Sequence, residues 1–182
     1  MKGSVAVSRR AFLAGAGALA SVPSITLGQS PRVFKYAVVG CGGRGRGAVR
    51  DIQAAAERLG HKAKLVGAAD FFKEKAEAVC KSNDCDTKFA FDGAAGYRKV
   101  METDAEIVLL AAPPIFRPLH LEACVRAGKH IFAEKPIATD PAGLRHFLKG
   151  VEEAKAKKLS ILSGTLHRHS NRFLRQIKPI RE

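Results

Sequence analysis

Three glycines carry the first chemical signal in the sequence. Gly40, Gly42 and Gly45 have the spacing Gly-x-Gly-x-x-Gly and stand directly after the apolar run 33–39. In a turn between a strand and a helix, such glycines allow a tight bend, close approach of the backbone to a pyrophosphate, and close packing of the helix. The phosphates then face the free N–H groups at the helix start. A glycine-rich turn without a ligand is the alternative. The predicted cofactor-binding residues of this loop are Gly40, Gly42, Gly43, Arg44 and Gly45.

An aspartate supports the interpretation of the loop as a dinucleotide-binding site. Asp70 ends a second apolar run, 64–69, and follows Gly45 by 25 residues. A carboxylate at this position can accept hydrogen bonds from the ribose hydroxyls on the adenine side, and its charge repels a 2′-phosphate. The sequence therefore predicts NAD as the cofactor, with NADP left open by the nearby cations Lys73 and Arg44. The alternative for Asp70 is the N-cap of the helix that follows.

A second group of candidate residues follows two later strand candidates. Pro113 and Pro114 end the apolar run 107–112, where no ladder hydrogen bond can continue. Farther along, Glu134, Lys135 and Pro136 follow the run 129–133. An ion pair on the surface is the alternative for Glu134 and Lys135.

These segments, in this order, resemble the Gfo/Idh/MocA oxidoreductases, and the resemblance covers about residues 34–173. Its most specific element is the run from Ala127 to Pro136. The resemblance implies hydride transfer between NAD(P) and a small-molecule sugar or cyclic polyol. It also implies a second α/β domain, which covers the nicotinamide, supplies a histidine for proton transfer and makes the contacts between subunits. We expect a homo-oligomer only if that domain is present.

The resemblance also assigns roles to individual residues. Lys135 would be the catalytic residue that binds and polarises the substrate hydroxyl, since an ammonium group stabilises a developing alkoxide. Glu134 would contact the nicotinamide side, and Pro136 would shape the end of the strand. Arg168 is a candidate on the substrate side, and His120 is expected to orient a helix. Pro113 and Pro114 correspond to the loop over the cofactor.

Strand and helix patterns alternate along the chain, which predicts an α/β fold with a doubly wound parallel sheet. We expect a Rossmann domain over residues 31–165 and the start of a truncated second domain over 166–182, with the rest of that domain missing. A stand-alone, non-catalytic NAD(P)-binding module or a decayed fragment is the alternative function. The expected strands are 33–39, 64–69, 87–91, 107–112, 129–133 and 159–163, and the expected helices are 46–59, 72–81, 97–102, 119–127 and 141–157.

The first thirty residues have the order of an export signal. Arg9 and Arg10 precede a weakly apolar run, 14–27, that is rich in alanine and glycine and contains Pro23. This order resembles a twin-arginine signal, which predicts transfer to the periplasm or secretion by the twin-arginine export machinery after folding in the cytoplasm. Export of a folded protein suits one that must acquire its cofactor first. A short core helix or membrane anchor is the alternative, although the run is too short and interrupted for a stable membrane span.

Charge and cysteine content narrow the range of partners. The formal net charge is +14, but the basic residues are dispersed and carry no aromatic interleaving, so we predict no nucleic-acid partner. The four cysteines lack zinc-ligand spacing, and His167 and His169 have no accompanying carboxylate or cysteine, so we predict no metal. Cys80 and Cys85 could form a disulfide in an oxidising compartment. The alternative is that both remain free thiols.

Overall fold

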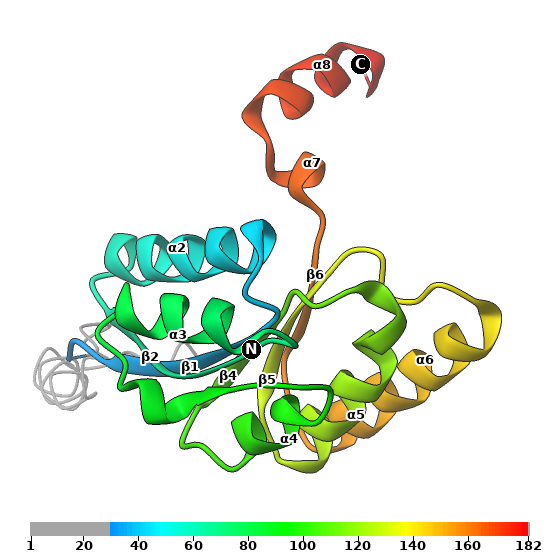
Figure 1. Ribbon diagram of the computed structural model, residues 1–182. Coiled ribbons are helices and arrows are strands. Elements are labelled where there is room, and N and C mark those ends of the chain that lie inside the picture. Colours follow the sequence, from blue (N-terminus) through cyan, green and yellow to red (C-terminus); the bar gives the residue numbers. More distant parts are fainter. Residues whose placement is uncertain (1–29, 182) are drawn as a thin grey trace, which may run out of the picture. The chain divides into compact units, whose positions relative to one another are not determined.

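A computed structural model describes residues 30–181, which form a parallel sheet with helices on both faces (Figure 1). The strands are β1 (Val33–Val39), β2 (Lys62–Ala69), β3 (Ala90–Phe91), β4 (Ile107–Leu110), β5 (His130–Glu134) and β6 (Ile161–Gly164). The helices are α2 (Gly43–Arg58), α3 (Lys73–Lys81), α4 (Gly96–Met101), α5 (Arg117–Arg126), α6 (Pro141–Ala156), α7 (Leu166–His169) and α8 (Asn171–Arg181), with two 3-10 turns, η1 (Thr87–Phe89) and η2 (Pro114–Phe116).

The sheet has the strand order β3-β2-β1-β4-β5-β6, and every neighbouring pair is parallel. Successive strands move outward from β1 to β3 and then, after a crossover, outward from β4 to β6 on the other side. The order therefore reverses between β1 and β4, and at such a switch point the loops after the two strands diverge and leave a crevice. This arrangement confirms the predicted doubly wound α/β fold.

Each face of the sheet has its own apolar core. One core joins Val38 of β1 to Val49 of α2 and Val79 of α3. The other joins Val108 of β4 to helices α4, α5 and α6, with Leu121 and Phe147 among its buried side chains. Because helices cover both faces, the central strands are apolar on both sides, which explains the continuous hydrophobic runs in their sequences.

Several element bounds differ from the predicted ones by a few residues, and two of these differences have a local cause. Residues 87–89 form the 3-10 turn η1 and not a strand, because the Asp86 carboxylate accepts the Lys88 N–H and bends the chain. Helix α5 begins at Arg117 and not at 119, since Pro118 is tolerated in the first helical turn. The segment 166–182, for which the sequence predicts the start of a second domain, contains helices α7 and α8 among its described residues.

The predicted twin-arginine signal lies outside the described residues. Within residues 30–181, none of the helices is both long enough and apolar enough to cross a membrane.

Candidate functional site

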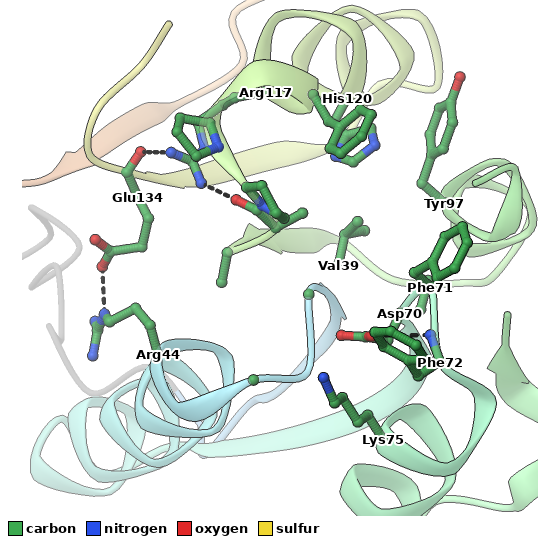
Figure 2. Close-up of a pocket in the computed structure, with 18 of the residues that line it drawn as sticks. Val39, Arg44, Asp70, Phe71, Phe72, Lys75, Tyr97, Arg117, His120 and Glu134 are labelled. Carbon is green, nitrogen blue, oxygen red and sulfur yellow. Dashed lines mark hydrogen bonds and ion pairs between the residues drawn. The ribbon is translucent and has the colours of Figure 1, made fainter. Parts of the chain in front are cut away.

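A cavity of about 840 Å³ lies where the strand order reverses, at the carboxyl ends of β1, β2, β4 and β5 (Figure 2). Most of the residues predicted from the sequence line it: Gly40, Gly42, Gly43, Arg44, Asp70, Pro113, Pro114, Glu134 and Lys135. Gly45, which is buried, and Pro136, which is exposed, are not among the lining residues. Arg168 is exposed on α7 and is not brought to the cavity.

The glycines of the loop fall into two kinds. Gly40 has a φ of +97°, and a Cβ there would stand 2.3 Å from the Ala112 nitrogen. A Cβ on Gly45 would stand 1.8 Å from the Gly40 carbonyl oxygen. In contrast, a Cβ on Gly42 or Gly43 would meet no atom within 4 Å. Packing within the protein therefore requires glycine at 40 and 45, whereas at 42 and 43 the missing side chains leave open space on the cavity wall.

Asp70 joins the end of β2 to the glycine loop. Its Oδ2 accepts the Cys41 N–H at 2.7 Å, and its Oδ1 accepts the Phe72 N–H at 3.1 Å. It is not the N-cap of α3, which is Phe72. Since each carboxylate oxygen can accept a further hydrogen bond, Asp70 can still receive a ribose hydroxyl in the cavity.

Glu134 is held at the opposite end of the cavity. Its Oε1 accepts the Arg44 Nε–H at 2.6 Å, and its Oε2 accepts the Lys135 backbone N–H at 3.2 Å. The carboxylate packs on Gly164, where a Cβ would approach Oε1 to 2.7 Å. Because Glu134 is buried and pairs with Arg44, the alternative of a surface ion pair between Glu134 and Lys135 does not hold.

Arg117 is a residue of the site that the sequence did not point to. It is 3% exposed, and its guanidinium donates to the carbonyl oxygens of Ala112, Glu134 and Pro136. Burial lowers the pKa of Arg117, and the charge of Glu134 opposes that shift. One side chain thus ties the end of β4 to the end of β5, on either side of Lys135.

His120 lies beside Arg117 in the wall of the cavity. It is 6% exposed, its ring lies 4.5 Å from that of Tyr97 and 6.0 Å from that of Phe116, and its Nδ1 has no hydrogen-bond partner. Burial, together with the charge of Arg117, lowers the pKa of His120 to about 4. The imidazole is therefore neutral at pH 7.

The depressed pKa of His120 predicts a loss of stability in acid. Between pH 6.5 and 4 the unfolded chain binds a proton at His120 that the folded protein does not, so stability falls as the pH falls. This group should account for about 2 to 3 kcal/mol lost between pH 7 and 4.5. Urea unfolding at both pH values should show a loss smaller by that amount in His120→Phe. Equal losses in the two proteins would contradict the assignment.

Among the described residues, no group of three or more histidine, cysteine, aspartate or glutamate side chains is placed to hold a metal ion. The four cysteines are buried free thiols.

A glycine loop between a buried strand and a helix, an acid after β2 and a cavity at the switch point define a dinucleotide-binding Rossmann domain. The model of the Gfo/Idh/MocA family, described as an oxidoreductase family with an NAD-binding Rossmann fold, matches residues 34–162, and the chain belongs to this family.

One relative agrees with this assignment in sequence, and two solved structures agree with the fold. The chain is 34% identical over 115 residues to an inositol 2-dehydrogenase of Rhizobium meliloti (strain 1021), covering 62% of this chain and 32% of that protein. It resembles the WlbA dehydrogenase of Chromobacterium violaceum in complex with NADH and UDP-GlcNAcA, with a TM-score of 0.64, 23% identity, and coverage of 84% of this chain and 41% of that one.

A second structure with a similar fold contains the other nicotinamide cofactor. It is a variant of a 3-ketoreductase from Actinomadura kijaniata in complex with TDP-benzene and NADP, with a TM-score of 0.63, 18% identity, and coverage of 84% of this chain and 44% of that one. The chain therefore spans less than half the length of each of these three proteins.

Proposed function

We propose that the chain is the cofactor-binding part of an oxidoreductase that transfers hydride between NAD(P) and a sugar or cyclic polyol. The observation that carries the proposal is the open space beside Gly42 and Gly43 on the wall of the cavity. The fold does not need glycine there for packing, whereas a pyrophosphate lying against the backbone does.

The two ends of the cavity bind different parts of the dinucleotide. Asp70 accepts the ribose hydroxyls on the adenine side, and the first N–H groups of α2 receive the pyrophosphate. The nicotinamide end then lies toward β5, because β2 and β5 stand on opposite sides of the switch point. A nicotinamide ring bound there supplies the hydride chemistry.

Lys135 is the residue that we assign to the substrate. It lines the cavity next to Glu134, at the end of β5. Its ammonium group would donate a hydrogen bond to the substrate hydroxyl and stabilise the oxygen as it gains negative charge. The preference for a sugar or polyol is supported by the similarity to an inositol 2-dehydrogenase.

We propose NAD as the preferred cofactor. The Asp70 carboxylate stands where a 2′-phosphate would have to lie, and the charges would repel. Lys73, considered from the sequence as an opposing cation, does not line the cavity. Lys75 does line it, with its Nζ 4.4 Å from the centre of the Phe72 ring. Its positive charge can attract a 2′-phosphate, so we expect weaker but measurable binding of NADPH.

Titration of the full chain with NADH and with NADPH, followed by nicotinamide fluorescence, tests this proposal. We expect saturable binding of NADH, and we expect Asp70→Asn to weaken it about tenfold, since lost hydrogen bonds to a charged group cost about 1.5 kcal/mol or more. The same variant should lose the preference for NADH over NADPH.

Asp86→Asn is the matched control. Asp86 also accepts the backbone N–H two residues later, as Asp70 does, but it lies away from the cavity. Its substitution should leave NADH affinity unchanged. If the folded wild-type chain bound neither cofactor, or if both variants behaved alike, the assignment of the cavity would be wrong.

A further inference from the structure

An ion pair joins the two sides of the cofactor cavity. Arg44, in the first turn of α2, donates to Glu134 at the end of β5, and the two residues are 90 positions apart in the chain (Figure 2). The Glu134 side chain is 10% exposed and that of Arg44 is 47% exposed. The hydrogen bond to Glu134 raises the pKa of Arg44.

Each of the three guanidinium nitrogens of Arg44 donates to a carboxylate in this arrangement. Nε donates to Glu134, while Nη1 and Nη2 donate to Asp51 at 3.2 and 3.1 Å. The guanidinium rests on Gly47, where a Cβ would come within 2.8 Å of Nη1. Arg44 is thus folded back along its own helix, and its charge is already neutralised.

The start of α2 lacks an anion of its own. No acidic residue lies in its first turn, and the N-cap, Gly42, has no side chain to accept its N–H groups. A pyrophosphate bound there would attract the cation of Arg44 as well as the helix amides, because the arginine side chain begins in the same turn. Glu134 and the phosphates therefore compete for one guanidinium.

Withdrawal of Arg44 has a consequence at Glu134. The carboxylate would keep its bond to the Lys135 N–H but lose its hydrogen bond to a cation while still buried, which is unfavourable. A ligand that reaches Glu134 with a hydrogen-bond donor compensates for that loss. The nicotinamide carboxamide has an N–H₂ group that can do so, whereas ADP-ribose ends before it.

We propose that the Arg44–Glu134 ion pair makes the site selective for complete dinucleotides over fragments that carry the pyrophosphate but lack the nicotinamide, such as ADP-ribose. The inference rests on the proposed function, since it takes the cavity as the cofactor site. Where the phosphates draw Arg44 from Glu134, only the complete dinucleotide provides Glu134 with a new partner at the nicotinamide.

The substitution Glu134→Gln tests the proposal through binding alone. It removes the competing charge and keeps the shape of the side chain. We expect the affinity for ADP-ribose, measured by calorimetry on the full chain, to rise about five- to tenfold, and the affinity for NADH to stay level or fall. Should Glu134→Gln fail to fold, Glu134→Met removes the same charge without a buried amide and carries the same expectation.

Two further variants of the chain distinguish this mechanism from a general effect of charge. Asp51→Asn removes the other carboxylate from the same guanidinium, but on its exposed side, and should change ADP-ribose affinity less than twofold. In an Arg44→Met background, Glu134→Gln should no longer improve ADP-ribose binding. The proposal is overturned if Glu134→Gln does not tighten ADP-ribose, or if the gain is equal in Asp51→Asn or persists without Arg44.

The wild-type titration keeps the two proposals apart. If the folded wild-type chain does not bind NADH, the proposed function itself fails. If it binds NADH normally and Glu134→Gln leaves ADP-ribose affinity unchanged, only the selectivity of the ion pair is refuted.

Discussion

Replacing Gly45 by alanine is expected to lower the free energy of unfolding by about 3 kcal/mol or more. The new Cβ would stand 1.8 Å from the Gly40 carbonyl oxygen, which belongs to the backbone of a tight turn and cannot rotate away. Either α2 moves off β1 or the turn opens, and both changes separate packed elements. For a chain of this size, such a loss corresponds to a melting temperature lower by about 10 °C.

Gly42→Ala is the matched control for this effect. Its Cβ would meet no atom within 4 Å, and its φ of −71° suits alanine. The free energy of unfolding should change by about 1 kcal/mol at most, since glycine and alanine differ modestly at an N-cap. NADH binding should nevertheless weaken at least about tenfold, because the methyl group occupies space that the pyrophosphate needs.

Urea unfolding followed by circular dichroism, together with NADH titration, measures both variants. Equal losses of stability in the two variants would contradict the division of the glycines into packing and cavity positions. Unchanged NADH affinity in Gly42→Ala would remove the main support for the cofactor site.

Replacing Arg117 by methionine is expected to cost about 2 to 4 kcal/mol of stability. The guanidinium is the donor for three carbonyl oxygens, and methionine offers none of them a hydrogen bond. The cost is moderated because burial already disfavours the charge, as the lowered pKa of Arg117 indicates. The ends of β4 and β5 would lose their common anchor, so NADH affinity should fall with stability.

Two other substitutions make the Arg117 prediction specific. Arg117→Lys keeps a donor but cannot reach all three carbonyls, so it should recover part of the stability and part of the NADH affinity. Arg126→Met, on the same helix, removes an arginine that is 72% exposed, and should change stability by about 0.5 kcal/mol at most. Calorimetric melting of the three variants provides the comparison. If Arg117→Met were as stable as Arg126→Met, the anchoring role would be wrong.

The residues that the sequence revealed stand directly after apolar strand patterns. Gly40 and Asp70 follow the runs 33–39 and 64–69, and Gly45 is limited by Gly40 within the same turn, although Gly40 also contacts Ala112 and Asp70 also binds Cys41 across the sheet. The run 107–110 is continuously apolar because helices cover both faces of its strand. In such places the local pattern and the tertiary role coincide, so the sequence predicted the fold class and most of its predicted site residues line the cavity.

The contacts of Arg117 and the Arg44–Glu134 ion pair could not be predicted from local sequence patterns. Arg117 stands before a proline at the start of a helix, which favours a surface position, and its partners lie 5, 17 and 19 residues away. Residues 87–89 look like a strand by composition, yet the Asp86 carboxylate turns them into η1. No periodicity in the sequence indicates any of these contacts.

The sequence by itself therefore determined the alternation of strands and helices, the glycine loop, the acid after β2 and the Glu-Lys-Pro segment. Only the tertiary structure decided which glycines border open space, where a buried arginine donates, and that Arg44 meets Glu134. The reason is that helix and strand patterns depend on neighbours along the chain, whereas the sheet brings together residues from the ends of different strands. Those contacts are set by strand order and register.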